Sequence, residues 1–136
     1  AGRPASLDTF DITPFVRVSM GPDLAKCRDA IRPEMALYVG GMGARAKNFY
    51  NDYAKRLGFA DAALKIQDAF LAGRRNEAMA AVPDQFIDET ALVGPPERIA
   101  ARVKEWKAAA KGNAIGTMLL GGADKAALRV IAEAAA

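Results

Sequence analysis

The chain has 136 residues, of which 51% are hydrophobic and 26% are charged, and its 19 basic and 16 acidic side chains give a formal net charge of +3. This composition is typical of a folded globular protein and excludes a disordered chain, and the small, scattered positive excess argues against a nucleic-acid-binding surface. The sequence lacks the run of about 18 apolar residues that a membrane-spanning helix needs.

One cysteine and no histidine restrict the chemistry further. A Ser-His-Asp or Cys-His catalytic group cannot be built within this chain, and no metal site is expected. A single cysteine cannot form an internal disulfide, which fits a reducing, cytoplasmic compartment. The sequence also lacks an initiator methionine, so we expect it to be a segment of a longer polypeptide.

The first predicted element is a strand over residues 12–20, because Phe15 and Val18 are strand-forming side chains. A turn at 21–23 follows, and Asp23 is a suitable N-cap for the next helix.

The next segment has apolar side chains at three- and four-residue steps, which predicts a helix over 24–38. Pro33 should kink this helix or split it in two. The glycine-rich stretch 40–43 is expected to end it.

Two further helices are predicted over 44–57 and 61–71, and Gly58 and Gly73 are expected to end them. Asn76 is then the predicted cap of a short helix.

Residues 86–93 are predicted to be helical rather than a strand, because the polar Asp88 and Glu89 lie side by side between apolar pairs. Neighbouring residues on a helix do not face each other, so these two carboxylates cannot act as a pair on one substrate. We interpret them as surface charge.

The clearest helix is predicted over 96–110, and a buried strand is predicted over 114–120. Asp124 should cap the last helix. That helix is expected to place three apolar residues on one face: Leu128, Ile131 and Ala135.

The predicted order is strand, several helices, strand, helix, which is a βα pattern with a long helical insertion. Two parallel strands alone do not form a stable sheet, because such strands are normally buried by neighbours on both faces. We therefore expect the two strands to be neighbours in a larger parallel sheet.

Two segments resemble a known family. Residues 37–52 (LYVGGMGARAKNFYND) and 92–99 (LVGPPERI) are similar to the C-terminal part of the luciferase-like oxidoreductases, in particular the branch that uses coenzyme F420, a deazaflavin. The resemblance implies an α/β fold in which residues 1–136 form a single partial domain, the C-terminal portion of a (β/α)8 TIM barrel. The predicted strands 12–20 and 114–120 would then be barrel strands seven and eight.

The same resemblance implies an activity. Members of this family transfer hydride between coenzyme F420, or alternatively FMN, and a small organic substrate. The implied partners are that substrate, the N-terminal remainder of the barrel and further copies of the chain. The catalytic residues themselves are expected to lie outside this sequence.

Some residues of this sequence are candidates for a site. Ser19 ends a predicted barrel strand, and such barrels place the active site at the carboxyl ends of their strands. Glycines let a ligand approach the backbone closely, so Gly40 and Gly41, together with the cation Arg45, are further candidates for cofactor binding. A plain turn between helices is the alternative interpretation of this stretch.

Aromatic residues suggest a substrate pocket. Tyr38 and Tyr50 could line it, although tyrosines at helical spacing are more often packing residues. A second hypothesis for the whole chain is a helical module that binds another protein and is not an enzyme. Under that hypothesis, residues 15–20 and 115–120 would not be barrel strands.

Overall fold

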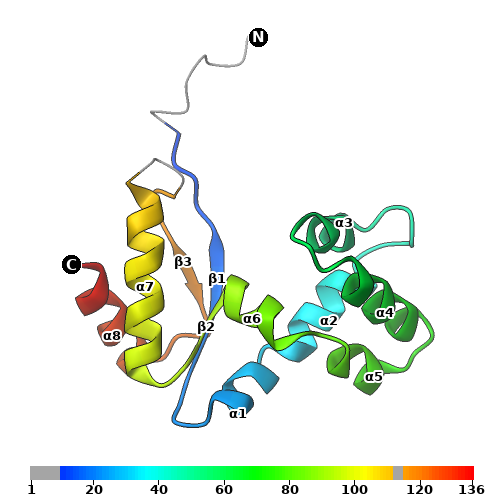
Figure 1. Cartoon of the computed structure of the whole chain (residues 1–136), viewed down its shortest axis with the longest axis horizontal. Coiled ribbons are helices and arrows are strands. Elements are labelled where there is room, and N and C mark those ends of the chain that lie inside the picture. The colour runs from blue at the N-terminus through cyan, green and yellow to red at the C-terminus, as the bar shows by residue number, and fades with distance from the viewer. Residues whose placement is uncertain (1–9, 112–114) are drawn as a thin grey trace. The chain divides into compact units, whose positions relative to one another are not determined.

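The computed structural model describes residues 10–111 and 115–136. They form two compact units, one built from the described residues up to Leu24 and from Ala91 onward, the other from residues 25–90 (Figure 1). The first unit contains the strands and two long helices, and the second is helical.

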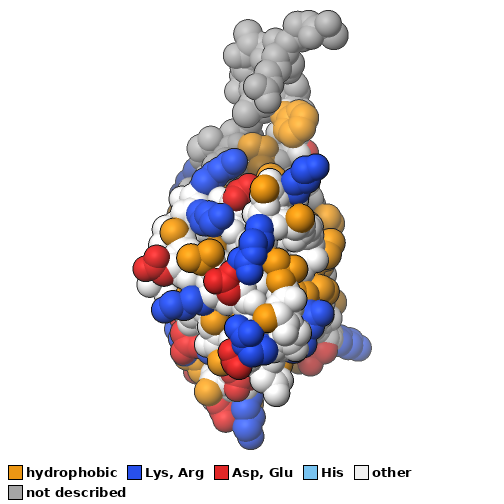
Figure 2. Space-filling view, turned by 90° about the vertical axis from the view of Figure 1, so that its right-hand side faces the viewer, with side chains coloured by type: hydrophobic (Ala, Val, Ile, Leu, Met, Phe, Trp, Pro, Cys, Tyr) orange, Lys and Arg blue, Asp and Glu red, His pale blue; other side chains and the backbone are white. Residues whose placement is uncertain are grey.

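The surface carries charges of both signs. On the face drawn in Figure 2, basic and acidic side chains are interspersed with hydrophobic ones, in agreement with the small net charge. In the described part of the chain, the helices are too short or too polar to cross a membrane.

The strands β1 (Phe15–Met20), β2 (Ala91–Gly94) and β3 (Leu119–Gly121) form a parallel sheet in the order β2-β1-β3. Val16 on β1 is aligned with Leu120 on β3. The expected parallel pairing of the first and last strands is therefore confirmed. Strand β3 is shorter than predicted, and the predicted beginning at Ala114 lies outside the described residues.

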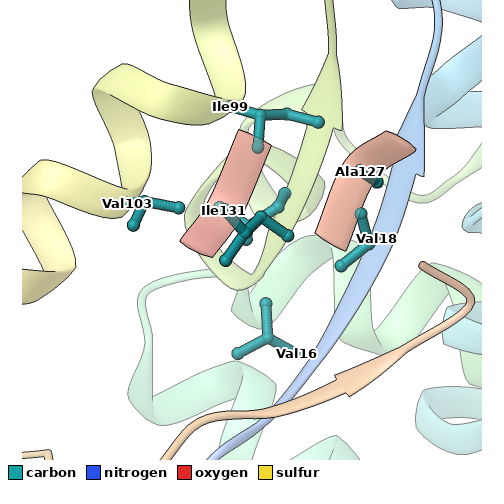
Figure 3. Packing of buried hydrophobic residues seen from close by; sticks show 7 residues of the cluster. Val16, Val18, Ile99, Val103, Ala127 and Ile131 are labelled. Atoms are coloured by element: carbon teal, nitrogen blue, oxygen red, sulfur yellow. The ribbon is translucent and has the colours of Figure 1, made fainter. Parts of the chain in front are cut away.

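One face of this sheet packs against α7 (Pro96–Ala110) and α8 (Lys125–Ala135). Its core consists of small and branched apolar side chains from the strands and both helices, seen in Figure 3: Val16, Val18, Leu92, Ile99, Val103, Ala127 and Ile131. Trp106 packs against this cluster as a partly buried side chain. The burial of these apolar groups is the main force that holds the unit together.

The buried face of α8 differs from the expected one. Leu128 is exposed, whereas Ala127 and Ile131 are buried. The start of the helix at Lys125, set by the Asp124 cap, turns Ala127 rather than Leu128 toward the sheet.

Strand β2 corrects the prediction of a helix over 86–93. The helix α6 (Asp84–Thr90) ends at Thr90, and the four residues of β2 that follow are all buried. The polar pair Asp88 and Glu89 belongs to α6, so it does not interrupt the strand. A short, fully buried parallel strand has no alternation of polar and apolar residues, and periodicity therefore does not distinguish it from a helix.

The order of the strands in the sheet differs from the order expected of the predicted (β/α)8 barrel. The connection from β2 through α7 to β3 passes across β1, whereas consecutive strands are neighbours in a barrel built in chain order. What the described residues establish is a small parallel α/β sheet. The (β/α)8 barrel is a prediction that this sheet does not confirm.

The helical unit is built from the remaining helices: α1 (Leu24–Asp29), α2 (Arg32–Gly41), α3 (Phe49–Arg56), α4 (Ala60–Leu71), α5 (Arg75–Ala80) and α6. The predicted split of the first long helix is confirmed, because Pro33 lies in the first turn of α2. Gly58 and Gly73 follow the ends of α3 and α4 with positive φ values, as expected of glycines at helix ends.

Three helix ends differ from the predicted ones. Helix α2 continues through Gly40 and Gly41 and ends only before Met42. Helix α3 begins at Phe49 because the side chain of Asn48 caps it. Asn76 lies inside α5 and does not cap it.

Candidate functional site

The predicted site residues are divided between the two units. Ser19 lies on β1 in the sheet unit. The other five lie in the helical unit, on α2, on α3 and in the connection between them: Tyr38, Gly40, Gly41, Arg45 and Tyr50.

Ser19 lies at the carboxyl edge of the parallel sheet. It is half-buried and aligned with Val93, next to Met20, which is aligned with Gly94. The N–H of Gly21 donates to the carbonyl oxygen of Gly94 at 3.0 Å, so the chain leaves both strands at the same level. This edge is where open and closed parallel sheets bind ligands.

The helices that follow the strands offer few free N–H donors to an anion at this edge. The carboxylate of Asp124 accepts the N–H of Ala127 at 2.8 Å and so occupies the N-terminus of α8. Helix α7 begins after Pro95 with Pro96, and prolines have no N–H to donate. The beginnings of α7 and α8 therefore offer few free N–H groups to a phosphate group.

Gly40 and Gly41 lie against an aromatic ring. A Cβ at Gly40 would be 2.5 Å from the Cβ of Phe70, and a Cβ at Gly41 would be 2.1 Å from the ring. Both glycines therefore allow α2 to approach α4 closely, which accounts for glycine at these positions without a ligand. Their contact with a cofactor stays a prediction.

Arg45 is engaged by an acidic side chain. Its guanidinium forms an ion pair with Asp68 on α4, and both side chains are exposed. A phosphate group would have to compete with this carboxylate, so the structure gives no separate support for a cofactor contact here.

Tyr38 and Tyr50 are brought together. Their ring centroids lie 4.7 Å apart in an edge-to-face arrangement. Phe49 packs edge-on against Tyr50 at 5.6 Å, and Tyr53 is stacked on Phe49 at 6.3 Å. We call these four residues the aromatic cluster. Phe49 was not predicted as a site residue, although it lies next to Tyr50 in the segment that carries the family resemblance.

Two buried asparagines hold this cluster in place, a role that the sequence analysis did not predict. The side-chain amide of Asn48 donates to the carbonyl oxygens of Tyr38 and Val39 at 3.2 and 2.9 Å. That of Asn51 donates to Val39 and Ala63 at 3.1 and 2.7 Å. Together they tie α3 to the end of α2 and to α4.

Charged side chains also join the two ends of the helical unit. Arg28 on α1 donates to both oxygens of Asp88 on α6, at 3.0 and 2.6 Å, and to Asp84 at 2.9 Å. These contacts raise the pKa of Arg28, chiefly through the hydrogen bond with Asp88. Asp88 is therefore a structural ion-pair partner, which corrects its interpretation as plain surface charge. Within residues 10–111 and 115–136, acidic, cysteine and histidine side chains do not gather into a metal-binding group.

Comparison with known proteins gives two matches. The family model described as luciferase-like monooxygenase matches residues 1–111. A Mycobacterium tuberculosis protein with the provisional description of a coenzyme F420-dependent oxidoreductase is 32% identical over 108 residues, which are 79% of this chain and 31% of that relative. The chain thus spans about a third of the length of this relative. No solved structure matches the chain.

Proposed function

The chain belongs to the luciferase-like monooxygenase family, and from this we propose that it forms part of an oxidoreductase that transfers hydride between coenzyme F420 and a small organic substrate. FMN is the alternative cofactor. The observation that carries the proposal is the family match over residues 1–111. The choice of coenzyme F420 rests on the similarity to the relative that is provisionally described as F420-dependent.

Exposed apolar side chains at the beginnings of β1 and β3 support a larger barrel. Phe15 and Leu119 are aligned with each other and are 58% and 52% exposed. Parallel sheets are normally buried on both faces, so further strands of the same polypeptide would cover these side chains. We propose that these strands are the N-terminal remainder of a (β/α)8 barrel.

The bound deazaflavin or flavin ring would supply the hydride chemistry. The residues that this chain offers to it are the hydroxyl of Ser19 and the backbone at Gly94 and Gly121, where the strands end. The hydroxyl can both donate and accept, which suits the carbonyl and N–H groups of such a ring. The apolar side chains around them would exclude water from the reacting atoms.

The test is a fluorescence titration of the intact polypeptide, this chain together with any preceding barrel strands, with coenzyme F420 and with FMN. A saturable change with coenzyme F420, weaker in Ser19→Ala than in the parent protein, is expected. Absence of a change with both cofactors would overturn the proposal. If only FMN binds, the cofactor in the proposal changes from coenzyme F420 to FMN.

A further inference from the structure

Helix α3 exposes the residues that a surface helix usually buries. Asn51 and Ala54 face the interior, whereas Phe49, Tyr50 and Tyr53 are 66%, 40% and 48% exposed. An amphipathic helix normally turns its aromatic side chains inward, because the burial of their large apolar area is favourable. This reversal leaves an aromatic surface in contact with solvent, which is typical of a binding site.

The backbone that carries the exposed rings is held in place. The hydrogen bonds of Asn48 and Asn51 fix the backbone of α3 on both sides of Phe49 and Tyr50. A ligand that binds such a preorganised surface loses less free energy to ordering of the protein.

The arrangement of the rings suits a planar ligand. Phe49 and Tyr53 are one helical turn apart, and their ring planes differ by only 6°. Tyr50 stands at 79° to Phe49, so the cluster offers both ring faces and ring edges. Aromatic groups prefer offset stacking and edge-to-face contacts of this kind.

The charge next to the aromatic cluster is positive. Arg56 follows Tyr53 by three residues and Phe49 by seven, which places all three along one side of α3. Lys47 directly precedes the Asn48 cap. Among the described residues, neither of these two exposed cations has an ion pair, whereas Lys55 is paired with Asp52 at 3.4 Å.

We propose that the aromatic cluster, together with Arg56 and Lys47, binds a planar aromatic anion such as an aromatic carboxylate. Stacking on the rings would hold the planar part, and the free cations would attract the negative charge. The identification of this anion as the substrate of the oxidoreductase rests on the proposed function. The binding site itself rests on the geometry of the helical unit.

The proposal is tested by amide-resolved NMR titration of the chain with naphthoate, with its neutral analogue naphthalenemethanol and with the aliphatic anion cyclohexanecarboxylate. Naphthoate should shift amides of α3 and of the end of α2, and it should bind about two- to fivefold more tightly than the neutral analogue, the range expected of one exposed ion pair. Cyclohexanecarboxylate should bind more weakly than both aromatic probes, because it lacks a ring that can stack.

Variants separate the two contributions. Phe49→Ala should abolish binding of both aromatic probes. Arg56→Gln should only reduce the preference for the anion, because Lys47 remains, and the double variant Lys47→Gln/Arg56→Gln should remove this preference. Lys55→Gln is the matched control, because Lys55 is already paired, and it should leave binding unchanged. All four side chains are exposed, and circular dichroism checks that the variants keep their helices.

The proposal is overturned if naphthoate does not shift the amide signals, or if the shifted amides lie outside α2 and α3. It is also overturned if the same amides shift with protein concentration alone, because this would identify a contact between copies of the chain. These outcomes do not depend on the binding of coenzyme F420 or FMN. A failure of the aromatic site is therefore distinguishable from a failure of the proposed oxidoreductase function.

Discussion

At the scale of single residues, Asp11 shows how one side chain outside the regular elements joins two strands. Its carboxylate accepts the backbone N–H of Thr117 at 2.8 Å and the hydroxyl of Thr117 at 2.7 Å. A Cβ at Gly116 would lie 2.0 Å from the same carboxylate, so a larger residue there would displace the Asp11 side chain from its present position. The contact links the segment before β1 to the segment before β3. These hydrogen bonds, first of all the one from the Thr117 hydroxyl, lower the pKa of Asp11.

The replacement Asp11→Asn should therefore destabilise the sheet in a pH-dependent manner. The pKa of Asp11 is lower in the folded state than in the unfolded state. The contribution of the Asp11 carboxylate to the stability of the fold is therefore fully present above the unfolded pKa of about 3.9, and it is lost as the pH falls through the folded pKa. Thermal unfolding at several pH values should show a lower Tm for the variant near pH 6 and a smaller difference near pH 3. A Tm difference that is constant with pH would contradict this assignment.

At the scale of elements, the sequence predicts helices and strands better than their contacts. Pro33, Gly58, Gly73 and Asp124 mark helix ends through backbone geometry and local hydrogen bonds, and the structure has helix ends at each of these places. Strand β2 was missed because it is short and buried on both sides. The Gly40 and Gly41 pair resembled a ligand loop, since nothing local reveals that Phe70, thirty residues away, occupies the space.

The close packing of α2 on α4 can be tested at Gly41. The replacement Gly41→Ala should destabilise the helical unit by about 1–3 kcal/mol, because the added methyl group would overlap the Phe70 ring. In a Phe70→Leu background the cost should be smaller, since the smaller side chain leaves room. Urea unfolding of the four proteins measures this coupling. Equal costs in both backgrounds would show that Phe70 is not the reason for the glycine.

The ion pairs between α1 and α6 can be tested at Asp88. The replacement Asp88→Asn should cost about 1–2 kcal/mol, because Arg28 loses a charged partner on side chains that are only about one-fifth exposed. The matched control is Glu77→Gln, whose partner Arg74 and own side chain are both well exposed. The control should change the free energy of unfolding by less than about 0.5 kcal/mol. Similar losses in both variants would contradict a structural role for the Arg28–Asp88 pair.

At the scale of the whole molecule, the family was recognisable from residues 37–52 and 92–99, and the family match agrees with it. The candidate site was less predictable. Tyr38 and Tyr50 do lie together. Asn48 and Asn51 belong to the segment that carries the resemblance, but their buried, structural role was not predicted, because polar residues are usually assigned to the surface. Phe15 and Leu119 are exposed in this structure, and the barrel strands that would cover them stay a prediction.

We propose that this chain contributes strands to a barrel that holds a deazaflavin or flavin at their carboxyl ends. The most direct measurement is a crystal structure of the intact polypeptide with coenzyme F420 bound. We expect further strands to cover Phe15 and Leu119 and the cofactor ring to contact the end of β1 at Ser19. A cofactor bound at the opposite edge of the sheet, or a sheet face that stays exposed to solvent, would contradict the account.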